Sequence, residues 1–475
     1  MALRKKGFFI RFTSLYLQYL CAMNGINDPI CALATPQGMG AIGILRTSGE
    51  GSIALVDGLF SGSLLVSDSH KALFGLFRDE SGEVVDEVLI TVFHKGRSFT
   101  GEESVEISFH GSPYILQKGL STLLNNGFRL ANPGEFTQRA FINGKLDLSQ
   151  AEAVADLIAS QSKRAHEIAL KQLRGAFSNE LKELREKLIH FASMIELELD
   201  FAEEDVEFAD RTELLKLLEE VLSYLRRLSR SFELGNAIKS GVPVAIVGAP
   251  NTGKSTLLNA LLGEERAIVS DIAGTTRDVI EETINIDGIQ YRLIDTAGIR
   301  EGAETIEAIG IERSRQKIEQ ASVVLCLSDA SDAESVRQVK EWVEELGASY
   351  PEKIILHVMN KSDLSQGFID INGSIQISAK EKENLEVLKS AITEKVVGDF
   401  NFADETIVSN ARHYDALIKT TQQLEKAKEG LISGITGDFV AMDIRQAMFE
   451  LGQITGDIST DDLLGNIFAK FCIGK

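Results

Sequence analysis

One loop of eight residues constrains the fold of this chain more than any other feature. Residues 248–255 read GAPNTGKS, a complete G-x-x-x-x-G-K-S pattern, between an apolar run at 242–247 and a helical run at 255–263. Glycines allow the backbone N–H groups of such a loop to turn inward around phosphate oxygens, and the following helix presents its positive N-terminal end to them. The order of strand, loop and helix argues against a chance match and predicts a nucleotide-binding α/β domain.

The loop also predicts individual roles. Lys254 is expected to reach the β- and γ-phosphates of a bound nucleotide, and the Ser255 hydroxyl is expected to bind Mg²⁺. The nucleotide contacts predicted here are those of Asn251, Thr252, Gly253, Lys254, Ser255 and Thr256.

Two later segments are suited to the γ-phosphate and its metal. The sequence DTAG at 295–298 ends the next apolar strand, where Asp295 can hold Mg²⁺ through water and Gly298 can offer its N–H to the γ-phosphate. The polar stretch DIAGTTRD at 271–278 suits a switch loop, with Thr276 as the second hydroxyl ligand of Mg²⁺. The contacts predicted from these segments are those of Ser270, Asp271, Ile272, Ala273, Gly274, Thr275, Thr276, Asp295, Thr296, Ala297 and Gly298.

The base is predicted by NKSD at 360–363, again at the end of an apolar strand, and by SAK at 378–380. The Asp363 carboxylate can accept hydrogen bonds from guanine N1–H and the 2-amino group, whereas adenine would leave this desolvated charge unpaired. The SAK segment can donate a backbone N–H to the guanine carbonyl. The predicted ligand is therefore GTP, contacted here by Asn360, Lys361, Asp363, Ser378, Ala379 and Lys380.

The residue that orients the attacking water is less plain. Ras-like enzymes place a glutamine after the DTAG-type segment, whereas this chain has Ile299 there. Glu301, Glu304 and Glu307 follow in the same stretch, and a solvated acidic face is the alternative for most of them. No arginine finger is obvious either. The Asn251 amide oxygen can instead help to hold a monovalent cation between the phosphates, or it can simply cap the loop.

The texture of the sequence changes along its 475 residues. Short apolar runs broken by Gly, Ser and Asp predict an N-terminal α+β domain at 23–142, and Leu/Ala/Glu/Lys-rich stretches predict helices at 143–238 and 399–475. Alternating strands and helices at 239–398 predict a doubly wound parallel sheet. We therefore expect a multidomain α+β fold, in which a Ras-like α/β P-loop domain is inserted into one discontinuous all-α domain.

Net charge and cysteine usage limit the expected binding partners and the cellular location. A net charge of -21 argues against broad non-specific nucleic-acid binding, so any RNA contact must be local. Four cysteines without a pairing pattern fit a reducing compartment, and no apolar run approaches the roughly 20 residues that cross a bilayer. The cytoplasm is the predicted location. The basic, acid-free residues 1–22 mimic a transit peptide or weak signal sequence, but an extension upstream of a start at Met23 is preferred.

In this order, the motifs resemble the tRNA-modification GTPases of the MnmE (TrmE) type over residues 28–475. The resemblance extends well beyond the nucleotide site. It rests on ATPQGMGAIGILRTSG at 34–49, FTGEESVEISFHGSP at 99–113, NPGEFTQRAFINGKLDLSQAEAVADLI at 132–158, IVSDIAGTTRD at 268–278 and FCIGK at 471–475.

The resemblance implies a homodimer joined through N-terminal folate-binding domains, and a heterotetramer with a flavin-dependent partner subunit. Together they would place an aminomethyl or carboxymethylaminomethyl group on C5 of the wobble uridine of certain tRNAs. A reduced folate, of the 5-formyl- or methylene-tetrahydrofolate type, would donate the one-carbon unit. The Ras-like α/β P-loop domains (G domains) of two copies would dimerise across K⁺ when GTP is bound, and this dimerisation would activate hydrolysis. A bacterial member fits better than an organellar one.

The resemblance also implies roles by position. Glu307 would orient the attacking water, and Ser270 stands where a threonine is common in the family. The implied K⁺ ligands are Asn251, Ser270, Ile272 and Thr275. The implied folate-binding residues are Arg46, Glu106, Lys145 and Lys475.

The chemistry of a folate suits these side chains, because cations can pair with its glutamate tail and Glu106 can accept from the pterin N–H edge. Ordinary salt bridges at Arg46 and Lys145 are the alternative. Cys472 would act in the modification reaction, and burial as an apolar side chain is the alternative.

Three further possibilities stay open. A basic stretch with Lys163, Arg164, His166, Lys171 and Arg174 is interpreted as a solvated helix face in preference to a tRNA or partner contact. A ribosome-assembly GTPase switch would share the nucleotide motifs but has no use for a folate pocket or the FCIGK tail. A module in which GTP controls only dimer scaffolding would tolerate Cys472→Ser.

Overall fold

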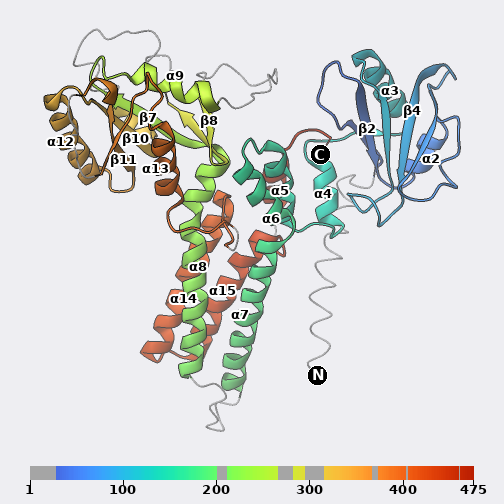
Figure 1. Cartoon of the computed structure of the whole chain (residues 1–475). Coiled ribbons are helices and arrows are strands. Elements are labelled where there is room, and N and C mark those ends of the chain that lie inside the picture. Colours follow the sequence, from blue (N-terminus) through green and yellow to red (C-terminus); the bar gives the residue numbers. More distant parts are fainter. Residues whose placement is uncertain are drawn as a thin grey trace. The chain divides into compact units, whose positions relative to one another are not determined.

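The computed structural model describes residues 28–200, 211–265, 282–294, 315–365, 373–402, 405–458 and 461–474 (Figure 1). Their contacts divide the chain into two compact units. One contains Met1–Ala155, Gln172–Asn179 and Gly452–Lys475, and the other contains Asp156–Lys171 and Glu180–Leu451. Among the described residues, no helix is both long enough and apolar enough to cross a membrane.

The first unit is built on a six-stranded sheet in the order β3-β4-β5-β2-β1-β6, antiparallel except for the parallel pair β1 and β6. Its strands are β1 (Ile30–Leu33), β2 (Ile42–Ser48), β3 (Lys71–Arg78), β4 (Val84–Phe93), β5 (Ser104–His110) and β6 (Arg129–Leu130). The helices α2 (Ser52–Asp57) and α3 (Pro113–Asn125) share one apolar core with the sheet. Side chains alternate across a strand, so the same strands present a second face, which Phe136 covers at β1 and which is open at Phe74 of β3 and Leu89 of β4.

This unit also contains α4 (Glu135–Ile142), the start of α5 (Leu148–Ala159) and α16 (Asp461–Phe468). Leu148 and Ala151 pack against Leu464, Phe468 and Phe471 in a small core of their own. The C-terminal residues therefore fold together with the N-terminal part of the chain.

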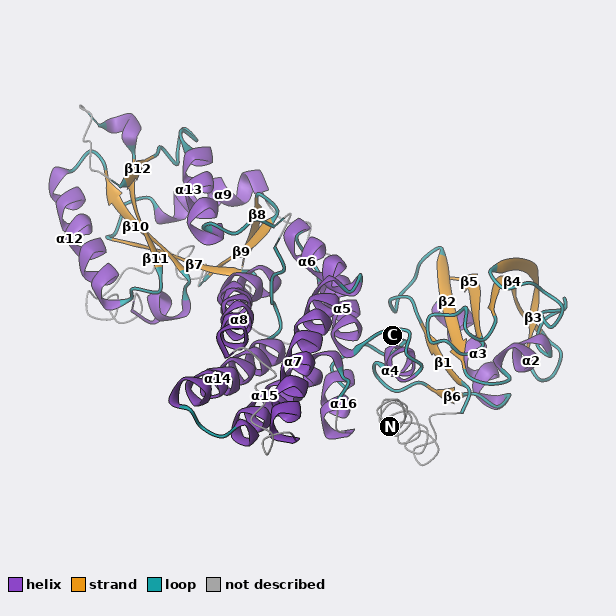
Figure 2. Cartoon of the chain, turned by 90° about the horizontal axis from the view of Figure 1, so that it is seen from below, coloured by secondary structure: helices purple, strands orange, loops and turns teal. Residues whose placement is uncertain are grey.

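The second unit contains a helical bundle whose members come from both sides of the nucleotide-binding sequence. Its helices are α7 (Ala176–Asp200), α8 (Arg211–Ser240), α14 (Ala411–Ser433) and α15 (Gly437–Thr455). The same unit contains most of α6 (Lys163–Leu173). Phe232 of α8 stacks on Tyr414 of α14 with ring centroids 4.4 Å apart. Figures 1 and 2 show α7, α8, α14 and α15 gathered in one cluster.

The segment between α8 and α14 forms a second six-stranded sheet, in the order β12-β11-β10-β7-β9-β8, which is parallel except at β8 and β9. Its strands are β7 (Val242–Gly248), β8 (Glu282–Ile286), β9 (Ile289–Leu293), β10 (Val323–Asp329), β11 (Ile354–Asn360) and β12 (Ser374–Gln376).

Helices cover both faces of this sheet. The helices α9 (Lys254–Glu265) and α13 (Leu385–Val397) share a core with Val244 and Ile246 of β7. The helix α12 (Ala333–Ser349) packs on the opposite face, against Ala245 and Val247. The predicted multidomain fold, with an α/β domain inserted into a discontinuous helical domain, is confirmed.

Candidate functional site

The loop between β7 and α9 has the backbone geometry that its glycines predict. Gly253 has a φ of 94°, and a Cβ there would lie 2.2 Å from the Asn360 side chain, so no larger residue fits. The Lys254 ammonium donates to the carbonyl oxygens of Gly248, at 3.0 Å, and Ala249, at 2.8 Å. The Thr252 hydroxyl donates to the same Ala249 carbonyl at 2.9 Å. The loop is thus closed around the lysine that is predicted to meet phosphate.

Asn251 lies at the tip of this loop in the left-handed region, with a φ of 62°. Asparagine is one of the few residues other than glycine that adopts this conformation readily. Its side chain is exposed, as are those of Ser255 and Thr256. These polar groups are therefore accessible to a ligand beside the loop.

Asn360 joins the phosphate loop to the predicted base-binding segments. Its side-chain nitrogen donates to the Thr252 carbonyl at 2.9 Å, and its side-chain oxygen accepts from the Ala379 N–H at 3.0 Å. The residue is only 2% exposed. One buried amide thus brings together three motifs that are far apart in the sequence.

Asp363 and Ser378 also meet at this edge of the sheet. The Ser378 hydroxyl donates to Asp363 Oδ1 at 2.6 Å. Ser378 is held in turn by backbone hydrogen bonds in both directions with Glu383, of 3.2 and 3.0 Å. The carboxylate that is predicted to recognise guanine therefore has a fixed orientation.

Lys361 has a neighbour that the sequence motifs do not include. Its ammonium lies 2.6 Å from Asp329 Oδ2, at the end of the adjacent strand β10. Asp329 follows an apolar run in the same way as the predicted site residues do, and this is the signal in the sequence that points to it.

Several predicted site residues lie outside the described part of the chain, and their roles stay predictions. They are Ser270, Asp271, Ile272, Ala273, Gly274, Thr275, Thr276, Asp295, Thr296, Ala297, Gly298, Glu307 and Lys475. Thr256 and Lys380, which are described, are both exposed.

The turn between β8 and β9 contacts the start of α6. The Gly288 carbonyl accepts from the Arg164 N–H at 2.9 Å, and the Gln290 amide donates to Gln161 Oε1 at 2.9 Å. The Arg164 guanidinium stacks over Phe402 at 4.6 Å, and Lys171 donates to the Phe402 carbonyl at 2.5 Å. The interpretation of this basic stretch as a solvated face is therefore wrong for Arg164 and Lys171, which pack within the second unit.

In the first unit, two of the implied folate-binding residues lie together. Arg46 of β2 and Glu106 of β5 are register partners, and Arg46 Nε and Nη2 lie 2.9 and 2.8 Å from Glu106 Oε1. The two side chains are 28% and 30% exposed. Lys145 is not in this pair, since its ammonium donates to the Gly96 carbonyl at 2.5 Å.

Cys472 differs from the other described cysteines. Cys31 and Cys326 are buried, and burial raises the pKa of each thiol to about 12. Cys472 is exposed, which excludes the alternative that it is a buried apolar side chain. Its carbonyl accepts from the Gly134 N–H at 3.4 Å, and a Cβ on Gly474 would lie 2.3 Å from the Leu33 carbonyl oxygen. The tail thus closely contacts both β1 and the start of α4.

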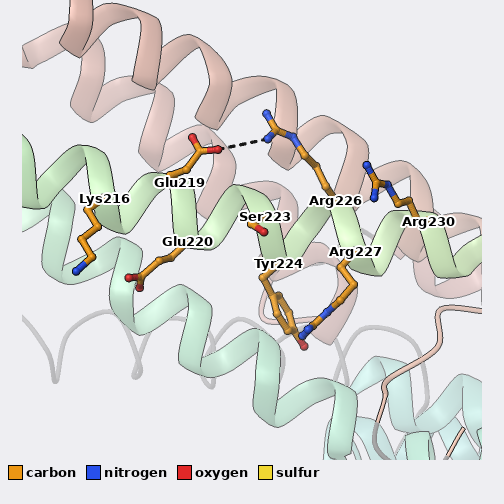
Figure 3. A pocket seen from close by; sticks show the side chains of 8 residues that line it. All are labelled: Lys216, Glu219, Glu220, Ser223, Tyr224, Arg226, Arg227 and Arg230. Atoms are coloured by element: carbon orange, nitrogen blue, oxygen red, sulfur yellow. Dashed lines mark ion pairs between the residues drawn. The ribbon is translucent and has the colours of Figure 1, made fainter. Parts of the chain in front are cut away.

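An open pocket of about 780 Å³ lies along α8, lined by four basic and two acidic side chains (Figure 3). Arg226 pairs with Glu219 at 3.6 Å and with Glu425 of α14 at 3.0 Å. The Arg227 guanidinium lies 5.0 Å from the ring centre of Tyr224. Glu219 and Tyr224 are on α8 itself, whereas Glu425 is on α14, so Arg226 links the two helices.

Comparisons with known proteins agree across nearly the whole chain. The family model described as "GTP-binding protein TrmE N-terminus" matches residues 29–145, and the model described as "MnmE helical domain" matches residues 148–472. Proteins named tRNA modification GTPase MnmE are 52% identical in Cytophaga hutchinsonii and 50% identical in Flavobacterium johnsoniae. Each alignment covers 94% of this chain and, respectively, 98% and 99% of the relative. This chain therefore belongs to the tRNA modification GTPase MnmE family.

Proposed function

We propose that this GTPase works with a flavin-dependent partner to build the aminomethyl or carboxymethylaminomethyl group on C5 of the wobble uridine of certain tRNAs. A reduced folate supplies the one-carbon unit. The observation that carries the proposal is the position of the C-terminal tail, where Gly474 packs against the Leu33 carbonyl and the Cys472 carbonyl accepts a hydrogen bond from the Gly134 N–H. A ribosome-assembly switch would need the nucleotide site but would have no use for this arrangement.

The proposed nucleotide site has a division of labour. Lys254 and the loop N–H groups bind the phosphates, and the Ser255 and Thr276 hydroxyls hold Mg²⁺. Asp363 accepts from guanine, while the buried Asn360 fixes the loops on either side of it. Glu307 orients the water that attacks the γ-phosphate.

The proposed K⁺ ligands are Asn251, Ser270, Ile272 and Thr275. A cation bound beside the phosphate loop would supply positive charge where negative charge develops during hydrolysis. The left-handed backbone and exposed side chain of Asn251 support this role, because they leave its amide oxygen accessible at the tip of the loop. Dimerisation of G domains across this cation would complete the site.

The proposed folate site contains Arg46, Glu106, Lys145 and Lys475. Both Arg46 nitrogens that contact Glu106 lie against its Oε1, so among the described residues Oε2 can accept from a pterin N–H edge. Lys475 directly follows Gly474, which packs at the end of β1, and Ala32 of β1 is the register partner of Arg46. This proximity along one strand pair supports a shared site, in which the exposed Cys472 thiol takes part in the modification.

The open face of the N-terminal sheet supports the proposed homodimer. It carries large apolar side chains in water, with Phe74 71% exposed, Ile42 64% and Leu89 46%. Phe74 and Leu89 are register partners on adjacent strands, so they form one patch. Contact with a second copy would remove this apolar surface from water.

The proposed domains are 23–142, 143–238, 239–398 and 399–475, with residues 1–22 as an extension. The proposed setting is the bacterial cytoplasm, and the bacterial relatives support the bacterial part of it.

Reconstitution tests the proposal. The purified chain, its flavin-dependent partner, GTP and unmodified tRNA are incubated with reduced folate labelled at its one-carbon unit. We expect label in the wobble uridine only when GTP and both proteins are present. Label transfer at the full rate without this chain would contradict the proposal.

A further inference from the structure

The ion pair between Asp329 and Lys361 links the ends of two neighbouring strands. Asp329 ends β10 and Lys361 follows β11, and Lys361 Nζ lies 2.6 Å from Asp329 Oδ2. The two side chains are 20% and 30% exposed, respectively. The pair is thus partly shielded from water, which strengthens a charge interaction relative to one on the open surface.

Hydrogen bonds within the turn after β10 orient the Asp329 side chain. Its Oδ1 accepts from the Ser331 N–H at 3.0 Å and from the Ser331 hydroxyl at 2.6 Å. Its own N–H donates to the Ser335 hydroxyl at 3.1 Å, and the next N–H, of Ala330, donates to the Asn360 carbonyl at 2.7 Å. One carboxylate oxygen is therefore occupied by the turn, and the other is directed at Lys361.

The carboxylate is charged at neutral pH. Burial favours the neutral acid, but the hydrogen bonds from Lys361 and Ser331 outweigh it and hold the pKa of Asp329 below its ordinary value. The aspartate thus presents a full negative charge to the ammonium.

Lys361 needs such an anchor more than most lysines do. Its φ of 64° and ψ of 38° lie in the left-handed region, which costs about 1 kcal/mol or more for a residue with a Cβ. It stands between Asn360, whose amide holds two loops, and Asp363, which is oriented by Ser378. A four-carbon stem held at this point can cover the face of a flat base, because lysine stems pack on apolar surfaces while the charged end stays paired.

We propose that Asp329 is a positioning residue of the guanine-binding site, which anchors the Lys361 ammonium so that the lysine stem is held against the purine. Asp329 touches neither the phosphates nor the water. It acts on nucleotide binding through Lys361, and the chemical step is independent of it.

A double-mutant cycle on the full-length chain tests this role, with GDP as the titrated ligand. Asp329→Asn keeps the acceptor for Ser331 and removes the charge, and Lys361→Met keeps a stem and removes the ammonium. We expect each single variant to raise the Kd for GDP by about fivefold, the scale of a partly exposed charge-assisted hydrogen bond. Because both changes break one contact, the double variant should be no weaker than either single variant by more than about twofold.

The steady-state kinetics separate positioning from catalysis. In Asp329→Asn, the KM for GTP should rise by the same factor as the Kd for GDP, while kcat is unchanged. Asp332→Asn is the matched control, since it removes an equal charge from the same turn and asparagine still caps α12. Its Kd for GDP should equal that of the wild type.

Two results would overturn the proposal. One is a Kd within twofold of the wild type in Lys361→Met, which decides the matter even if Asp329→Asn fails to fold. The other is that Asp329→Asn raises the Kd for GDP by the same factor in the wild-type and Lys361→Met backgrounds. Asp329 would then act only on the turn that contains it.

Discussion

The Asn360 side-chain amide donates a 2.9 Å hydrogen bond to the Thr252 carbonyl, and so ties the end of a strand to the phosphate loop. The side-chain oxygen of the same amide accepts a hydrogen bond from the Ala379 N–H. Because the predicted phosphate loop and the predicted base-binding loops share one buried side chain, their geometry is coupled in the absence of nucleotide.

Replacing Asn360 with alanine should therefore damage both stability and nucleotide binding. Two backbone groups would lose their partner, at a cost of about 1–3 kcal/mol each if they remain buried. We expect a lower Tm in thermal unfolding and a Kd for GDP raised by at least about tenfold. Asn259→Ala, on the exposed face of α9, is the control and should leave both values unchanged. A wild-type Kd in Asn360→Ala would show that the coupling has no part in binding.

The contact between Gly288 and the start of α6 makes a separate prediction. Gly288 has a φ of 80°, and a Cβ there would lie 3.1 Å from Lys163 Cβ. Gly288→Ala should cost the roughly 1 kcal/mol of left-handed strain plus the cost of the close contact, as measured by denaturant unfolding. Gly434→Ala has similar strain but nothing within 4 Å of its Cβ. Equal losses in the two variants would mean that the contact with α6 contributes nothing.

Removing the charge of Glu106 should affect folate binding much more than the stability of the fold. Glu106→Gln removes a charge from a pair that is about one-third exposed, so the free energy of unfolding should fall by less than about 1 kcal/mol. The Kd for 5-formyltetrahydrofolate should nevertheless rise by about tenfold or more, because a charge-assisted contact is lost. Glu87→Gln, an exposed acid on β4, is the control. Unchanged folate binding in Glu106→Gln would leave the pair as an ordinary salt bridge.

The proposed cation beside Asn251 predicts that hydrolysis depends on the alkali metal. We expect turnover in KCl to exceed turnover in NaCl at equal ionic strength by about tenfold or more. Asn251→Gly suits the left-handed backbone, and so removes the amide without strain. In this variant, turnover in KCl should exceed turnover in NaCl by much less than it does in the wild type. Equal rates in KCl and NaCl for the wild type would remove the cation from the mechanism.

The strands, loops and helices that carry the predicted nucleotide contacts could be located from the sequence, because they depend on local backbone geometry. The loop at Gly253 lies between a strand and a helix, Asn360 ends β11, and Ser378 follows β12. The same local logic found the two helical stretches and the inserted α/β domain. The antiparallel β8 at the sheet edge was not predicted, since strand order depends on pairings that no short pattern encodes.

The missed contacts share a physical cause. The apolar run before Asp329 places it at a strand end, but its partner Lys361 is known only once β10 and β11 are paired. Arg164 and Lys171 appear solvated on a helical wheel, but Phe402, more than 200 residues away in the sequence, packs against them. A long-range partner of this kind leaves no trace in the local periodicity.

Nucleoside mass spectrometry of bulk tRNA tests the central claim most directly. tRNA is compared from cells with the gene, cells without it, and cells without it that carry a restored wild-type copy. We predict that the C5-modified wobble uridine disappears with the gene and returns with the restored copy. An unchanged nucleoside profile in cells without the gene would contradict the role in tRNA modification, while the GTPase assignment would stand and an assembly switch would become the better account.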